Sequence, residues 1–322
     1  MKNNKFRKQV EQKFSWDIDT LGEYVEEQSP EIIPSLINDG RTASLIPVME
    51  GVKHKDRIKL FTTDLVLQSA ATCGWNALGS AVFTDDEMEV VPIKVNLAFC
   101  SENLNGAWTQ LGLPNGVRNQ RENLPYNDLV ISHFRGKTML ANEKLIWIGD
   151  TGSVDPNINQ FDGFKVRFDA DGTVSDLNLT NVTAFTQNNI IGILQDMVVA
   201  LDVTVRAAAH KIFVGQEVFD LYKLALANAN LYHQTPDMAA DTIQIFGTST
   251  MMERVTGLDG TNSIYAGPTD FMRIGTDLES DWEDFSIRYD DNADEVRVKI
   301  QYRLGVKYVY GNLFKKYLLA TS

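Results

Sequence analysis

The feature of the sequence that most restricts its fold is a pair of extended segments within residues 46–98. The segments IPVMEGVKHKDRIKLFTTDLVLQ and AVFTDDEMEVVPIKV both carry alternating apolar residues, and the stretch CGWNALGS between them holds Gly74 and Gly79. Two extended segments around a glycine-bearing turn predict a long β-hairpin. Many charged residues stand beside its apolar positions, so this hairpin is poorly suited to the core of a monomer. An edge of a sheet and an arm that reaches another molecule are both consistent with these residues.

Residues 1–45 are predicted to form a polar arm with one short helix. Apolar residues at helical spacing, Ile18, Leu21 and Val25, are followed by prolines that end the pattern. This segment cannot bury much surface by itself, so we expect it to lie on another surface, such as a neighbouring copy. Its basic start is consistent with a solvated tail or with a contact to an anion, and comprises Lys2, Lys5, Arg7 and Lys8.

Periodicity predicts three helices in the middle of the chain. One long helix begins after Pro125 and ends near Gly149, and residues 150–180 are predicted to be a loop with short strands. A second helix covers residues 188–206, and a third covers residues 216–230 after the buried strand KIFVG. The apolar stripe of the second helix consists of Ile190, Ile193, Leu194, Met197 and Leu201. This alternation of strand and helix indicates a small α/β unit.

The last hundred residues are predicted to be mostly β-structure. Their strongest alternation sets Val296, Val298 and Ile300 against Arg297 and Lys299, and DDNAD before it is predicted to be a hairpin turn. A chain of 322 residues is long enough for about two domains of ~150 residues each.

Charge and composition narrow the possible partners. The net charge of −13 argues against tight, sequence-independent binding to phosphate backbones, which needs a stripe of Lys and Arg. No run of apolar residues is long enough to span a membrane, and the first residues lack the apolar core of a signal peptide. We therefore expect a protein that is made and kept in a cytoplasm, with Cys73 and Cys100 as free thiols.

Motifs that carry chemistry are weak throughout the sequence. The segment Arg135–Thr138 (RGKT) lacks the glycine that a phosphate-binding loop needs at the position of Ile131. The segment Asp169–Thr180 resembles the start of a calcium loop but has Thr180 in place of the bidentate glutamate, so a β-turn is the better interpretation. Two further groups fit no site: the acidic residues Asp281, Glu283 and Asp284, which indicate a solvated face, and the scattered residues His54, His133, His210 and His233. We predict no catalytic, cofactor-binding or metal-binding residue.

Five segments of the chain carry a resemblance to a known family. They are FTDDEMEVVPIKVNLAFC at 83–100, LPYNDLVISHFRGKTMLANEKLIWIGDT at 124–151, FDGF at 161–164, IIGILQDMVVALD at 190–202 and KIFVGQEVFDLYKLALANANLYH at 211–233. In this order they resemble the major capsid proteins of tailed bacteriophages, and most of all those of crAss-like phages that infect gut Bacteroidetes. The resemblance extends over about two thirds of the chain. The segment GTNSIYAGPTDFMRIGTDL and the hairpin after it resemble the closing section of such coat proteins.

The resemblance implies an α+β chain with the Hong Kong ninety-seven type fold. It implies an N-terminal arm at residues 1–50 and a long hairpin, the E-loop, at residues 51–98. A peripheral domain with a long spine helix would comprise residues 99–188 and 286–322, and an axial domain would comprise residues 189–285. Cys73 would then be a packing or contact residue near the tip of the hairpin, and Cys100 a buried small hydrophobe.

The function that the resemblance implies is that of a coat protein, not an enzyme. Copies of the chain would form hexamers and pentamers of an icosahedral head that encloses DNA without reading its sequence. The expected partners are other copies, a portal, a scaffolding protein and possible decoration proteins, with no cofactor and no membrane. The location would be the virion, after assembly in the cytoplasm of the bacterial host. Alternatives are the shell protein of a bacterial nanocompartment with the same fold and an unrecognised acidic cytoplasmic enzyme.

Overall fold

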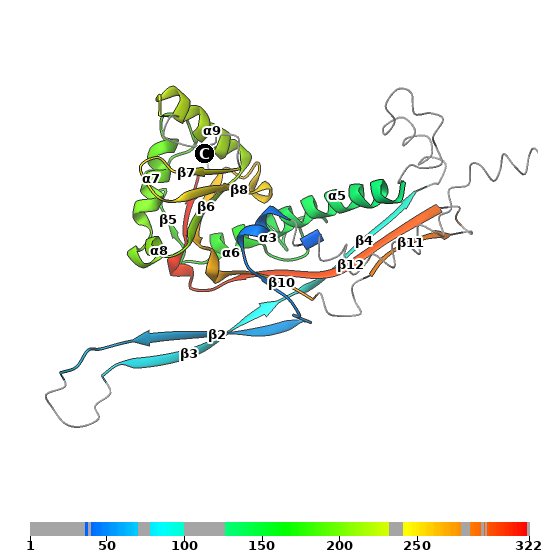
Figure 1. The fold of residues 1–322 in the computed structure, drawn as a ribbon, viewed down its shortest axis with the longest axis horizontal. Helices are drawn as coiled ribbons and strands as arrows, with labels where there is room; N and C mark the ends of the chain where they lie inside the picture. Colours follow the sequence, from blue (N-terminus) through cyan, green and yellow to red (C-terminus); the bar gives the residue numbers. More distant parts are fainter. Residues whose placement is uncertain are drawn as a thin grey trace, which may run out of the picture.

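The chain folds into two lobes with a projecting hairpin (Figure 1). We call them the elongated lobe, which is built on a five-stranded sheet, and the compact lobe, which is built on a six-stranded sheet. The architecture is α+β, as expected. The computed structural model describes residues 36–37, 40–69, 78–99, 126–231, 241–277, 284–290, 293 and 295–320.

The sheet of the elongated lobe is organised around one long strand, β12 (Glu295–Tyr308). Every second residue from Val296 to Leu304 is buried. Since successive side chains of a strand point to opposite faces, one face of this part of β12 lies on the core. The predicted turn before it is confirmed by the antiparallel pairing that begins at Asp290 and Glu295. The other strands of this sheet are β1 (Val48–Met49), β4 (Val91–Phe99), β10 (Met272–Thr276) and β11 (Asp284–Asp290).

The long helix predicted after Pro125 is α5 (Tyr126–Ile148), which runs beside β4 and β12 (Figure 1). Its last turns enter the main core, where Trp147 is fully buried. The segment 150–180, predicted to be a loop with short strands, also contains a helix, α6 (Phe164–Ala170), so that prediction is wrong in part. Phe164 and Phe168 lie one turn apart on the buried face of α6, and this short apolar repeat was hidden between turn-forming residues.

The sheet of the compact lobe has the strand order β5-β13-β9-β6-β8-β7. It packs with α7 (Ile190–Ala200), α8 (Val203–Ala207) and α9 (Gln216–Asn228) around a second core. Every residue of its central strand β9 is buried. The strands are β5 (Ser175–Asp176), β6 (His210–Val214), β7 (Thr242–Gln244), β8 (Met251–Arg254), β9 (Ser263–Pro268) and β13 (Lys315–Leu318).

The helix predicted over residues 188–206 is in fact two helices. Leu201 has an extended backbone, and the Asp202 side chain accepts a hydrogen bond from the Thr204 N–H at 3.3 Å, so Asp202 begins α8 as its N-cap. The predicted apolar stripe from Ile190 to Leu201 is buried, as expected. The predicted stripe is therefore confirmed, whereas the N-cap at Asp202, which divides the helix, was not predicted.

The two lobes meet through aromatic side chains and through a close backbone contact. The Trp147 ring of α5 lies 5.0 Å from that of Phe213 in β6, measured between ring centroids. The turn η3 (Thr256–Leu258) packs so closely on α5 that a Cβ atom on Gly257 would overlap the carbonyl oxygen of Glu143 and the Trp147 side chain. Glycine at this position therefore allows the lobes to make contact.

The hairpin predicted between residues 46 and 98 is present as β2 (Lys55–Asp64) and β3 (Ser80–Glu89), which pair with each other along their full length. The predicted second strand does not stay in the hairpin. It bends at Val90, whose side chain is buried and whose N–H donates to the His54 carbonyl at 3.0 Å, and it then joins the elongated sheet as β4. The hairpin is therefore continuous with the sheet that carries it.

Candidate assembly surface

The β2–β3 hairpin forms a two-stranded sheet by itself and projects from the body (Figure 1). Nearly all of its residues are exposed, apart from those at its root. Directly opposed residues of an antiparallel pair lie on the same face. The register therefore decides which side chains the hairpin presents together, and it divides one face into a charged half and an aromatic half.

The charged half of this face has cations on β2 and carboxylates on β3. The opposed pairs are Lys55 with Glu89, Arg57 with Glu87 and Lys59 with Asp85. Lys55 Nζ lies 3.5 Å from a Glu89 carboxylate oxygen, and Arg57 reaches diagonally to Asp85 at 3.7 Å. These side chains are about half exposed or more, and each such pair stabilises a fold by only about 0–1 kcal/mol. Their main effect is to oppose slippage of the register.

The far half carries apolar side chains that nothing in the chain covers among the described residues. Phe61 and Phe83 stack across the strands with ring centroids 4.5 Å apart, yet they are 54% and 73% exposed. We call the exposed apolar side chains of the outer part of the hairpin, on both of its faces and in the chain just beyond its strands, the apolar tip: Phe61, Leu65, Val66, Leu67, Leu78, Val82 and Phe83. Exposed apolar side chains gathered in one place mark interaction surfaces, and an isolated two-stranded hairpin is marginal in water. The geometry favours cover by another molecule.

The root of the hairpin is, by contrast, firmly packed. Met88 and Val90 are fully buried and form a small core with Val52. A Cβ atom on Gly305 would overlap the Glu89 carbonyl oxygen, and one on Gly275 would overlap the Met88 side chain. The backbone of β12 thus approaches the root at a distance that only glycine permits, and Gly275 in β10 leaves room for the Met88 side chain.

Three polar contacts fix the direction in which the hairpin leaves the body. Lys307 Nζ lies 2.7 Å from Asp86 Oδ1 in β3, and the Tyr310 hydroxyl donates to the Phe61 carbonyl at 3.3 Å. The Arg303 guanidinium donates to the Lys53 carbonyl as well. The end of β12 and Tyr310 after it therefore hold the hairpin from its root as far as Phe61, and the rest of the apolar tip lies beyond these contacts.

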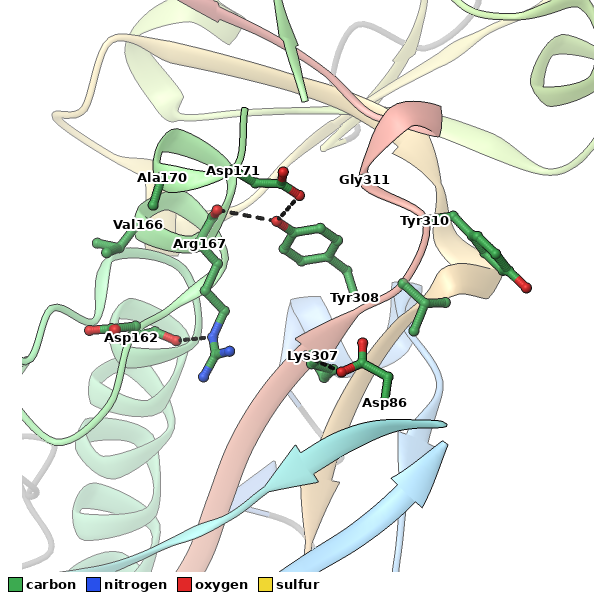
Figure 2. Close-up of a pocket in the computed structure, with 11 residues that line it drawn as sticks. Asp86, Asp162, Val166, Arg167, Ala170, Asp171, Lys307, Tyr308, Tyr310 and Gly311 are labelled. Atoms are coloured by element: carbon green, nitrogen blue, oxygen red, sulfur yellow. Dashed lines mark hydrogen bonds and ion pairs between the residues drawn. The ribbon is translucent and has the colours of Figure 1, made fainter. Parts of the chain in front are cut away.

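A crevice of about 470 Å³ lies between the hairpin, α6 and the chain that follows β12 (Figure 2). Its polar groups are engaged within the chain. The Tyr308 hydroxyl donates to Asp171 Oδ2 at 2.9 Å, and Arg167 Nε donates to the Asp162 carbonyl at 2.7 Å. Burial and the neighbouring Asp171 carboxylate raise the pKa of Tyr308, so its hydroxyl stays protonated as a donor. The Tyr308 contact joins the end of β12 to the end of α6.

The residues considered above as nucleotide-binding, calcium-binding or catalytic candidates do not lie together in one site. The segment Arg135–Thr138 lies within α5 rather than in a loop after a strand. Asp169 is in α6, and Asp171 accepts hydrogen bonds from the Thr173 N–H and hydroxyl at 2.8 and 2.7 Å, which is the geometry of a turn. Over the part of the chain that the structure describes, no three His, Cys, Asp or Glu side chains group closely enough to hold a metal ion.

The remaining candidates are separate from one another or outside the described residues. His54 and His133 are exposed, and His210 lies 2.8 Å from the Thr250 hydroxyl, measured from its Nε2. Asp284 begins β11. Predictions for the basic start of the arm, for Cys73, Cys100 and His233, and for Asp281 and Glu283 lie outside the described residues.

Sequence reasoning identified the hairpin but not the residues that give it its surface. Phe61 and Phe83 were not singled out, because neither belongs to a motif. The signal that could have found them is the register: counting from the root toward the turn places two aromatic residues opposite each other beyond a run of paired charges.

Comparisons with known proteins agree with this architecture through structure rather than sequence. The sequence matches no protein-family model, and a search of curated proteins gives no match. Among solved structures, a chain of the satellite phage P4 procapsid that includes the size determination (Sid) protein is similar, with a TM-score of 0.60 and 9% identity over 91% of this chain and 99% of that chain. A chain of Gordonia phage Cozz gives a TM-score of 0.57 and 12% identity over 87% and 86%.

A third similar structure is the virus-like particle from Pyrococcus furiosus, with a TM-score of 0.50 and 10% identity over 90% of this chain and 98% of that chain. In all three cases the match covers the greater part of both chains, so both lobes are shared rather than a single motif. The chain therefore has the Hong Kong ninety-seven type phage capsid fold that the sequence resemblance implied. None of the described helices is both long and apolar enough to cross a membrane.

Proposed function

We propose that this chain is the major capsid protein of a tailed double-stranded DNA bacteriophage, and that its copies form the hexamers and pentamers of an icosahedral head. The observation that carries the proposal is the projecting hairpin, whose apolar tip is exposed on a chain that shares its fold with phage capsid chains over about nine tenths of its length. A surface of this kind stabilises nothing in an isolated chain. It becomes useful when a second copy covers it.

The contact between copies would be heterologous, because the apolar tip of one copy meets a different surface on the next. Contacts of this type close into rings when the rotation between copies allows it, and rings of five and six are the units of an icosahedral shell. Stable interfaces bury roughly 1,200–2,000 Å² in total. A hairpin with ten-residue strands and seven exposed apolar side chains is suited to part of such an area.

The domain division remains a proposal based on the resemblance. It consists of an arm at residues 1–50, an E-loop at 51–98, a peripheral domain at 99–188 and 286–322, and an axial domain at 189–285. The elongated lobe with α5 would be the peripheral domain and the compact lobe the axial domain. We propose three exchanges between them: β10 would join the peripheral domain, and β5 and β13 the axial domain, because each strand pairs within that lobe's sheet.

The finer identity is proposed from the sequence resemblance alone. The five ordered segments favour the crAss-like phages of gut Bacteroidetes. The same resemblance favours a portal, a separate scaffolding protein and decoration proteins as partners, and assembly in the host cytoplasm before residence in the virion. Enclosed DNA would be held without sequence-specific contacts, consistent with a net charge of −13.

A second candidate is the shell protein of a bacterial nanocompartment. The likeness to the virus-like particle from Pyrococcus furiosus favours it, although the TM-score is lower than for the phage chains. The two candidates differ in what the shell contains. Particles that protect double-stranded DNA from nuclease support the phage assignment, and particles filled with a cargo protein support the alternative.

The first experiment measures the mass of the purified chain by light scattering, with negative-stain images of the same fractions. Pentamers, hexamers, tubes or closed shells are the expected result. A strict monomer at high concentration calls for the same measurement with the candidate scaffolding protein added. Continued absence of assembly in that mixture would overturn the coat function.

A further inference from the structure

A short helix, α3 (Arg41–Leu45), lies where the two lobes meet, and its first two residues are held from opposite sides. The Arg41 guanidinium donates to the Glu253 carboxylate in β8 of the compact lobe. Thr42 donates to the Glu143 carboxylate in α5 of the elongated lobe. Both carboxylates are only 3% exposed. Two adjacent residues thus join two buried charges that belong to different lobes.

On the elongated side, Glu143 acts as the missing cap of α3. The N-cap residue of this helix is Gly40, which has no side chain to accept a hydrogen bond from the first turn. Glu143 Oε1 accepts the Thr42 N–H at 2.8 Å, and its other oxygen accepts the Thr42 hydroxyl, which in turn accepts a hydrogen bond from Trp147 Nε1 at 2.8 Å. A Cβ atom on Gly40 would lie 2.6 Å from Glu143 Oε1, so a larger residue would push this contact apart.

On the compact side, Arg41 completes an ionic group around the buried Glu253 carboxylate, in which the side chains of Arg41 and Lys211 are 35% and 28% exposed. Glu253 accepts hydrogen bonds from Lys211 Nζ at 2.8 Å and from the Thr242 hydroxyl at 2.6 Å, both within the same sheet. Arg41 adds a second cation and also donates to the Thr242 hydroxyl at 2.7 Å. Arg41 is the one member of this group that does not come from the sheet of the compact lobe.

Stability alone does not account for this arrangement. Well-packed apolar residues often stabilise a core as much as a buried ionic network does, and removal of one partner leaves an uncompensated charge. Such networks are instead sensitive to position, because their hydrogen bonds hold at one geometry only. A group that ties both lobes to one short helix is therefore suited to fixing how the lobes sit relative to each other.

We infer that Arg41 and Thr42 form a latch that fixes the angle between the two lobes. Leu36 and Ile37, just before the latch, are 2% and 3% exposed in the main core, so this part of the chain is anchored in the elongated lobe. A change in the angle between the lobes would act on the contacts of Glu143 and Glu253 together. The use of the latch rests on the proposed function: in a shell, contacts with neighbouring copies would act on both lobes, and the latch would hold them at one angle.

Hydrogen–deuterium exchange of the full chain tests the coupling. In Arg41→Met, we expect exchange to become roughly tenfold faster in β7 and β8, where the ionic group is lost, and also in α3 and the second half of α5, which Arg41 does not touch. In Thr42→Val the direct loss is at α5, and we expect β7 and β8 to exchange faster as well. The matched control is Arg254→Met, which removes the neighbouring cation of β8, whose ion pair at 3.0 Å is with Asp241 and not with Glu253.

Faster exchange in β7 and β8 alone for Arg41→Met, or a change in α5 of equal size for Arg254→Met, would overturn the latch. If Arg41→Met does not fold, Arg41→Lys keeps the charge but loses the planar donor geometry, and the same pattern is expected with a smaller increase. The exchange pattern is measured on the unassembled chain, so it reports on the latch even if no shell forms. If the wild type forms shells, Arg41→Met is expected to give particles of mixed size or shape. Uniform shells from Arg41→Met would overturn the role of the latch in assembly.

Discussion

The two hairpins β11–β12 and β2–β3 follow the same pairing rules and differ in what covers them. In the first, Val296, Val298, Ile300 and Tyr302 face the core and are at most 2% exposed. In the second, the apolar side chains of the tip are 46–99% exposed. Alternation makes both segments hairpins, but α5 and the rest of the elongated lobe cover only the first. The same local pattern thus gives a buried core in one place and an exposed apolar surface in the other.

The comparison also shows where the stability of each hairpin comes from. The β11–β12 hairpin is stabilised by its own buried side chains. The β2–β3 hairpin depends on its root at Met88 and Val90, on its exposed ion pairs and on contacts such as Lys307 with Asp86. Substitutions in the two hairpins should therefore separate the stability of the chain from its capacity to assemble.

The largest effect on stability is expected for Ile300→Ala. Ile300 is 2% exposed in the main core, and its truncation leaves a cavity that should lower the free energy of unfolding by about 2–5 kcal/mol. Urea denaturation followed by circular dichroism measures the change. A loss below about 1 kcal/mol would contradict the claim that buried side chains stabilise the β11–β12 hairpin.

A smaller loss is expected for Gly305→Ala at the root of the projecting hairpin. The added methyl group meets the Glu89 carbonyl oxygen, so β3 must shift, at a cost of about 1–3 kcal/mol. Gly136→Ala in α5 is the control, because a Cβ atom there meets nothing within 4 Å and should stabilise the helix by about 0.5–1 kcal/mol. Equal results for the two variants, again by urea denaturation, would show that the root is not closely packed.

A pH-dependent effect is expected from Glu143 beneath the latch. Burial raises the pKa of this carboxyl above its ordinary value of 4.5, although the hydrogen bonds from Thr42 and the charge of Arg41 oppose the rise. A raised folded pKa means that the folded state binds the proton more tightly than the unfolded state. The contribution of Glu143 is then fully present below pH 4.5 and is lost as pH rises through the folded pKa.

Glu143→Gln removes this titration and keeps an acceptor for the Thr42 N–H. We expect the wild type to lose stability relative to this variant as pH increases from 4.5, measured as the difference between their urea midpoints at each pH. A difference that stays constant over this range, or grows in the opposite direction, would contradict the raised pKa.

The smallest effect on the isolated chain is expected for Phe83→Ser in the apolar tip. Phe83 is 73% exposed, so the free energy of unfolding should change by no more than about 0.5 kcal/mol. Assembly should nevertheless fail or weaken strongly, because the side chain is proposed to be covered by another copy. Sedimentation and negative-stain images measure it, with Lys59→Gln in the charged half as the control. Normal shells from Phe83→Ser would remove the apolar tip from the interface.

Sequence periodicity by itself determined most of the local structure. The long helix α5, the stripe of α7, the strand β6 and the β11–β12 turn were all predicted, because each has a strong repeat or turn signal close in the chain. The predictions that failed depended on signals that cover few residues. Helix α6 has only seven residues, and the break between α7 and α8 depends on one capping aspartate, Asp202.

Tertiary structure alone decided which predicted surfaces are covered. The sequence shows two alternating hairpins but not that α5 lies over one of them, because that depends on contacts between residues far apart in the chain. It also gives no hint that Arg41 and Thr42 reach Glu253 and Glu143, which are 212 and 101 residues away. Local periodicity sets which segments form strands and helices, whereas burial and electrostatics depend on residues that the fold brings together from distant parts of the chain.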